Sequence, residues 1–277
     1  AYLNALLAER RGDTATVQSA LKQVTELLDP VPPEFIRYRP QMLMLNGLAH
    51  FGLNQFEKAT GYLEAFQKVQ GNSPASKLLA RIYLSNGNAG LAATVLETYL
   101  KAQPGDGQAM TLLANAYMSQ GRNSKAVTLM QQALKAEDNP GYRTVLGLSL
   151  VGSGQAAVGI AELEAALKKD PRQVQAGAAL VDLYLKSNQA RKGVPVAESL
   201  VKLQPNNARF HNLLGMAQGQ SGNIAAARAS FAKAIQLDDN LVLAKLNMAR
   251  LEIATKAFDA ASKRLNDLLK LNERNSE

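Results

Sequence analysis

Cysteine and tryptophan are absent from this chain of 277 residues, and histidine occurs only twice. Without cysteine the chain can form no disulfide, no cysteine-ligated metal site and no thiol nucleophile. Aromatic residues make up only 5% of the chain, so small aliphatic side chains must supply most of the packing. No stretch approaches the roughly 18 consecutive apolar residues that span a bilayer. A cysteine-free chain suits the cytosol and the periplasm equally.

The net charge is +8, from 31 basic and 23 acidic residues. A basic balance can indicate a nucleic-acid or anionic-membrane partner when the charges are concentrated. Here the excess is spread thinly and rises gently toward the C-terminus, and the densest local run is Lys168 and Lys169. This distribution argues against a nucleic-acid groove.

The strongest pattern in the chain is a repeat, which is most easily read at one small or polar position. Its copies are Gly12, Asn54, Gly87, Gly121, Gly154, Asn188, Gly222 and Lys256. The successive intervals are 42, 33, 34, 33, 34, 34 and 34 residues, so only the first is irregular. Gly and Asn best tolerate the left-handed conformation that ends a helix. The pattern therefore predicts a turn between two helices at each copy.

Other positions keep the same phase around these turns. A large apolar residue follows the turn at Leu63, Leu96, Met130, Leu163, Phe231 and Leu265. A helix-breaking residue closes the units at Asp29, Pro104, Asp138, Pro171, Pro205 and Asp239. Apolar residues spaced three and four apart on both sides of each turn predict two amphipathic helices per unit.

This helix–turn–helix unit of about 34 residues resembles the tetratricopeptide repeat. The resemblance implies an all-α fold, a right-handed α-solenoid of about eight units that occupies residues 1–277 as a single domain. The expected units are 1–39 (truncated), 40–72, 73–106, 107–139, 140–173, 174–207, 208–241 and 242–277. Each unit stacks on its neighbours because one helical hairpin cannot bury its apolar stripe alone.

Three features depart from the regular pattern. The longer join between Asp29 and Pro40 interrupts the first interval. Pro195 lies inside an expected second helix, which should therefore begin late, near Gly193, or kink. The N-terminus reads as the second half of a helix already under way and shows no signal-peptide pattern, so we expect the chain to be a fragment of a longer protein.

In such a stack the first helices line a concave surface, and residues one helical step from their buried stripe should face it. The expected groove residues are Lys77, Arg81, Thr111, Asn115, Thr144, Leu148, Asp182, Lys186, Asn212, Met216, Gln220 and Arg250. Their polar and mildly basic character, with some apolar floor, suits an extended peptide or a partner helix. We therefore predict a binding scaffold for a protein or peptide, and no enzyme.

Lys77, Arg81 and Asn115 form the sharpest constellation, because some chaperone-binding tetratricopeptide domains hold a peptide carboxylate with Lys and Asn at comparable positions. Thr111 stands where a second helper residue is wanted, so the match is partial. An acidic-group contact is one hypothesis for these residues, and a solvated basic patch is the other.

No constellation of catalytic or metal-binding residues emerges. His50 and His211 fall at repeat positions that favour packing, and neither has a second histidine at a ligand spacing. Asp238 and Asp239 lie at an inter-unit turn, where Asp caps the following helix. The glycines of residues 151–159 fall on the turn of the repeat itself, with no strand before them, which excludes a phosphate loop. We expect no cofactor and no metal.

Three stretches of the second half, residues 143–171, 210–240 and 243–270, resemble in that order the tetratricopeptide lipoproteins of the PEP-CTERM/exosortase system. That resemblance implies a periplasmic, lipid-anchored parent protein, with its anchor outside this chain, that acts in exopolysaccharide export or envelope protein sorting. A cytoplasmic adaptor or co-chaperone-like array of the same architecture is the alternative.

Overall fold

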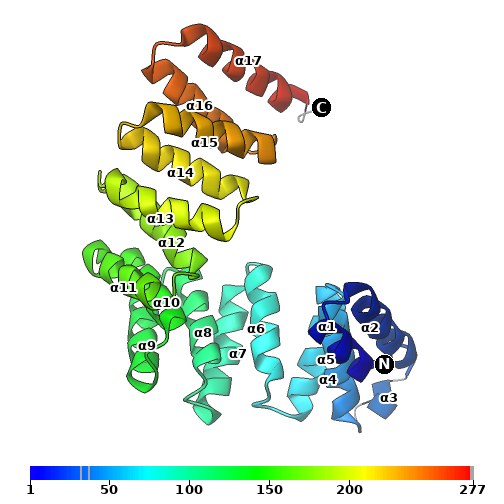
Figure 1. Ribbon diagram of the computed structural model, residues 1–277. Coiled ribbons are helices and arrows are strands. Elements are labelled where there is room, and N and C mark those ends of the chain that lie inside the picture. Colours follow the sequence, from blue (N-terminus) through cyan, green and yellow to red (C-terminus); the bar gives the residue numbers. More distant parts are fainter. Residues whose placement is uncertain (32, 37, 275–277) are drawn as a thin grey trace. The chain divides into compact units, whose positions relative to one another are not determined.

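The computed structural model describes residues 1–31, 33–36 and 38–274, and within these ranges the regular structure is entirely α-helical. The chain separates into two compact units, Ala1–Glu137 and Asp138–Glu277. Each unit consists of antiparallel helix pairs stacked in chain order (Figure 1). This confirms an α-solenoid architecture, and the extension of one solenoid over both units stays a prediction.

The helices follow the expected alternation of first and second helices. The first unit contains α1 (Tyr2–Arg10), α2 (Thr14–Leu28), α3 (Pro33–Ile36), α4 (Pro40–Gly52), α5 (Phe56–Val69), α6 (Ala75–Ser85), α7 (Ala89–Ala102), α8 (Gly107–Ser119) and α9 (Asn123–Ala136). The second unit contains α10 (Pro140–Gly152), α11 (Ala156–Lys169), α12 (Val174–Lys186), α13 (Ala190–Leu203), α14 (Ala208–Gln220), α15 (Ile224–Leu237), α16 (Val242–Ala254) and α17 (Phe258–Arg274).

The predicted turn positions are confirmed by their backbone conformation. All eight have positive φ, from 57° at Asn188 to 93° at Gly222. At each turn the amide of the following residue donates to the carbonyl five residues earlier, as from Gln189 N to Tyr184 O at 2.7 Å. This bond satisfies a carbonyl that the helix end would leave unpaired. Left-handed residues and this hydrogen bond together reverse the chain at every hairpin.

Small residues let the two helices of a pair approach closely. A Cβ atom added to Gly147 would lie 2.7 Å from the side chain of Leu163, and one added to Gly215 would lie 2.6 Å from Phe231. Both large partners are buried. Because such separations are sterically impossible, the glycines decide how near each second helix lies to its first helix.

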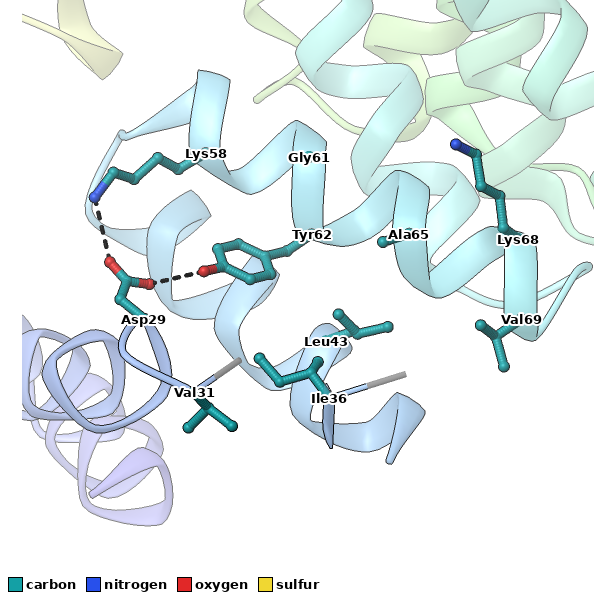
Figure 2. Close-up of a pocket in the computed structure, with 10 residues that line it drawn as sticks. All are labelled: Asp29, Val31, Ile36, Leu43, Lys58, Gly61, Tyr62, Ala65, Lys68 and Val69. Atoms are coloured by element: carbon teal, nitrogen blue, oxygen red, sulfur yellow. Dashed lines mark hydrogen bonds and ion pairs between the residues drawn. The ribbon is translucent and has the colours of Figure 1, made fainter. Parts of the chain in front are cut away.

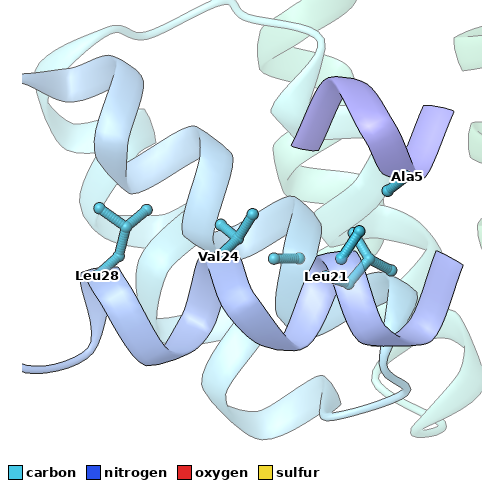
Figure 3. Close-up of a cluster of buried hydrophobic side chains, with 6 residues drawn as sticks. Ala5, Leu21, Val24 and Leu28 are labelled. Atoms are coloured by element: carbon cyan, nitrogen blue, oxygen red, sulfur yellow. The ribbon is translucent and has the colours of Figure 1, made fainter. Parts of the chain in front are cut away.

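The core continues from one hairpin to the next. In the first unit Ala5 of α1 packs with Leu21, Val24 and Leu28 of α2 (Figure 3), and Ala49 of α4 completes this cluster. In the second unit similar clusters join α11 to α12 and α13 to α14. Each hairpin therefore buries its apolar stripe against its neighbours in sequence.

A recurrent side-chain hydrogen bond also joins consecutive hairpins. Tyr83 of α6 donates to Glu64 of α5 at 2.5 Å, and Tyr117 of α8 donates to Glu97 of α7 at 2.9 Å. The Tyr184 hydroxyl of α12 makes the same bond to Glu164 of α11. Each tyrosine lies four residues before a turn, so the repeat places this bond at equivalent joints.

The structure contradicts one of the two alternatives expected at Pro195 and the helix cap expected at Asp238 and Asp239. The helix that contains Pro195 begins at Ala190 rather than near Gly193 and continues to Leu203. Pro195 lies on the exposed face, so the carbonyl that loses its amide partner can bond water instead. The kink stays a prediction. Asp238 and Asp239 do not cap α16, because its N-cap is Leu241 and receives no side-chain hydrogen bond.

Candidate partner-binding surface

First helices of successive hairpins contact one another along the second unit and at one place in the first unit. In the second unit α10 contacts α12, α12 contacts α14, and α14 contacts α16, and in the first unit α6 contacts α8. The expected groove residues fall at three levels along the helix axes, each one helical turn from the next. The level nearest the N-terminal ends of the helices is called inner, and the level nearest the C-terminal ends is called outer. The inner level is Lys77, Thr111, Thr144 and Asn212; the middle level is Arg81, Asn115, Leu148, Asp182, Met216 and Arg250; the outer level is Lys186 and Gln220.

The inner level is mostly occupied by contacts within the protein. Thr144 is 2% exposed and donates to the Pro140 carbonyl, and Asn212 is 7% exposed and accepts a hydrogen bond from Asn247 of the next first helix. The expectation that Thr144 and Asn212 face a ligand is therefore wrong. The neighbouring first helix packs close enough to cover this level, which the period alone does not reveal.

Lys77 already has a carboxylate partner within the chain. Its ammonium lies 2.8 Å from Asp106 Oδ2 and 3.3 Å from Gln108 Oε1. Asp106 also accepts from the Ala109 amide and so caps α8; desolvation raises the pKa of its carboxyl, but the bonds from Lys77, Ala109 and Tyr99 outweigh this and lower it. Lys77 therefore stabilises the joint between α6 and α8.

Arg81 contacts a different neighbour from Lys77. Its guanidinium lies 5.3 Å from the centre of the Phe51 ring. Because Lys77 is paired and Arg81 rests on an aromatic face, the structure does not join them into a clamp for one carboxylate. Thr111, the expected helper residue, donates to the Gly107 carbonyl of its own helix. The acidic-group hypothesis for this constellation is not supported.

The middle level is the accessible part of the expected site. Arg81, Asp182 and Arg250 are exposed, and the other members are half-buried. Desolvation raises the pKa of the Asp182 carboxyl, and the charge of Lys186 one turn later opposes that rise. At the outer level Gln220 is exposed and donates to the Leu185 carbonyl and to Asn188 Oδ1 of the preceding hairpin.

Both histidines make hydrogen bonds within the protein. His50 is fully buried, as the repeat position predicted, and His211 bonds the Pro205 carbonyl at 2.8 Å. No cluster of three acidic or histidine residues suited to a metal ion occurs within residues 1–31, 33–36 and 38–274. Among these residues, no helix combines the length and apolar character that crossing a membrane requires.

A polar network that the sequence did not predict lies at the irregular join. Asp29 Oδ1 accepts hydrogen bonds from His50 Nε2 and Asn46 Nδ2, each at 2.8 Å, and from the Tyr62 hydroxyl at 3.2 Å. Lys58 lies 3.2 Å from the other carboxylate oxygen. Desolvation of Asp29 opposes these bonds, but they outweigh it and lower its pKa to about 2. The long first interval and Asp29 as helix breaker were the only sequence signals.

A pocket of about 820 Å³ adjoins this network. Figure 2 shows Lys58 and Tyr62 of α5 reaching Asp29, with Val31, Ile36 and Leu43 along the opposite wall. Of the residues that line it, none belongs to the expected groove set. The structure therefore has two candidate surfaces, one on the first helices and one on α5.

Stacked helical hairpins that offer extended surfaces, with no reactive cluster among the described residues, define a helical-repeat interaction scaffold. Family comparison agrees: tetratricopeptide repeat profiles match residues 44–107, 77–142 and 178–242, and a second profile of that description matches 220–277. The chain belongs to the tetratricopeptide repeat family. This family supplies protein-interaction scaffolds, is generally non-enzymatic, and binds protein or peptide partners.

Solved structures show the same fold at low sequence identity. A tetratricopeptide repeat protein from Parabacteroides merdae ATCC 43184 has a TM-score of 0.66 and 15% identity, over 91% of this chain and 97% of that one. A chain of the APC/C hetero-tetramer Cut9–Hcn1 has a TM-score of 0.67 and 15% identity, over 86% of this chain and 48% of that one. MamA of strain RS-1 has a TM-score of 0.56 and 18% identity, over 60% and 94%. No curated protein sequence matches the chain.

Proposed function

We propose that this chain is a non-enzymatic scaffold that docks a protein or peptide partner on the middle level of its first helices. The observation that carries the proposal is the accessible row on α10, α12, α14 and α16, formed by Leu148, Asp182, Met216 and Arg250. Apolar and charged side chains of both signs alternate along it, which suits a partner that presents a mixed surface. One solved chain of the same fold is part of the hetero-tetramer Cut9–Hcn1.

We propose further that the parent protein acts at the bacterial cell envelope, in protein sorting or exopolysaccharide export. The resemblance of residues 143–171, 210–240 and 243–270 to the PEP-CTERM/exosortase lipoproteins supports this setting. A periplasmic or outer-membrane location through an anchor outside the chain goes with it. Fractionation of the full-length protein tests the location, because recovery in the soluble cytoplasmic fraction would contradict it.

Charge reversal on the first helices tests the docking surface. The double variant Asp182→Arg and Arg250→Glu changes two exposed side chains on α12 and α16, and the control Glu198→Arg with Lys202→Glu changes two exposed side chains of the second helix α13. Each purified chain is used as bait in native envelope extract. We expect recovery of the partner to fall about tenfold for the first pair only. Equal recovery from both variants would overturn the proposal.

A further inference from the structure

The pocket on α5 shares no lining residue with the first-helix row, and part of its wall comes from the long first interval. Val31, Ile36 of α3 and Leu43 of α4 lie along one wall, and one face of α5 forms the other; α3 also contacts α4. On α7 the equivalent positions, Leu91, Thr94 and Thr98, are exposed to solvent. Residues of the irregular join therefore give this helix face a second wall and make it one side of an open pocket.

The middle of this pocket is apolar and unfilled. Val31, Ile36 and Leu43 face Ala65 and Val69 of α5 across it. A Cβ atom added to Gly61 in the same wall would meet nothing within 4 Å. An apolar cavity of this size, about 820 Å³, favours a large aliphatic or aromatic side chain, because burial removes its surface from water.

The charged residues that line the pocket indicate which residue types stand next to the large apolar residue of the ligand. The single carboxylate, Asp29, already accepts bonds from His50, Asn46, Tyr62 and Lys58, so it is not available to hold a cation. Two lysines lie on the rim: Lys58, which pairs with Asp29 but keeps 61% of its side chain exposed, and Lys68, which is also exposed. The charged lining thus carries two ammonium groups and one carboxylate, which favours acidic ligand groups.

The spacing of the two lysines sets the length of the ligand. They lie ten positions apart on α5, which corresponds to about 15 Å along a helix. An extended peptide covers this distance with about four or five residues, and its side chains at i and i±2 point the same way. We infer that the α5 pocket binds an extended partner segment with one large apolar residue and an acidic residue two positions to either side.

The test uses a displayed library of random peptides selected on the full chain. Gly61→Leu fills the pocket, and its control Gly90→Leu makes the same change on α7, where a Cβ atom also meets nothing within 4 Å. Both changes favour helix over glycine, so neither threatens folding. Lys68→Glu reverses the rim charge, and Lys101→Glu does so at the equivalent position of α7.

We expect the selected peptides to share the acidic–apolar–acidic pattern at alternate positions. Their affinity should fall about tenfold or more on Gly61→Leu and on Lys68→Glu, and remain unchanged on Gly90→Leu and Lys101→Glu. Selection without this pattern, or binding insensitive to Gly61→Leu, would overturn the inference. So would a dimer in sedimentation that Gly61→Leu dissociates, because the occupant would then be a second copy. The variants leave α12 and α16 intact, so this result is independent of the first-helix test.

Discussion

Two joints between consecutive hairpins are held by different side-chain hydrogen bonds: the irregular joint between α2 and α4, and the regular joint between α11 and α12. At the regular joint Tyr184 donates one hydrogen bond to Glu164. At the irregular joint His50, which stands in the tyrosine position, bonds Asp29, and three further donors converge on that carboxylate. His50 also stacks on Tyr62, with ring centres 5.5 Å apart and planes within 4°.

This difference shows how a helical repeat tolerates an insertion. A regular interval presents each tyrosine to the preceding hairpin, so one bond is enough. The longer join moves the end of α2 relative to α4, and a shared carboxylate with several donors replaces the single bond. The same insertion supplies part of the wall of the α5 pocket. Regular joints thus provide stability, and the irregular joint also provides a candidate site.

Removal of the shared carboxylate should give the largest effect. Asp29→Ala leaves His50 and Asn46 buried without their common acceptor, and we expect a loss of about 2 to 4 kcal/mol in the free energy of unfolding. Urea denaturation followed by circular dichroism measures this loss. Asp239→Ala, at a side chain 78% exposed, is the matched control and should change stability by less than about 0.5 kcal/mol. Equal losses in the two variants would show that the shared carboxylate contributes no more to stability than an exposed aspartate does.

Acid should weaken the same joint over a defined pH range. Bonding lowers the folded-state pKa of Asp29 to about 2, although desolvation opposes it. A lowered pKa means that its stabilisation is complete above the unfolded pKa, near 4, and is lost as the pH falls toward 2. We expect the stability difference between wild type and Asp29→Asn to shrink across this range; a constant difference would refute the assignment.

A regular joint should be less sensitive than the irregular one. Tyr184→Phe removes one hydroxyl and its bond to Glu164, and we expect a loss of about 1 kcal/mol in the free energy of unfolding. Tyr83→Phe and Tyr117→Phe should lose similar amounts, because their bonds to Glu64 and Glu97 are equivalent. The same denaturation measurement applies. A loss as large as that of Asp29→Ala would mean that both joints depend on one critical contact.

Much of the fold could be predicted because its signals are local. Glycine or asparagine occupies seven of the eight turn positions, all of which have positive φ, and the helix period is visible in the spacing of apolar residues. The binding surface was harder to predict. Thr144 and Asn212 have the right spacing for exposed residues, yet their neighbours bury them. Burial depends on how closely the next first helix packs, and the period does not encode that distance.

The sequence by itself determined where this chain turns, how its helices pair and that its repeats belong to a binding scaffold, because backbone sterics and helix periodicity act over a few residues. Only the tertiary structure decided that Asp29 meets His50, that Lys77 is held by Asp106, and that α5 faces a pocket. Those contacts join residues about one repeat apart or less, on different helices. Their existence depends on the distance and rotation between hairpins, which packing sets.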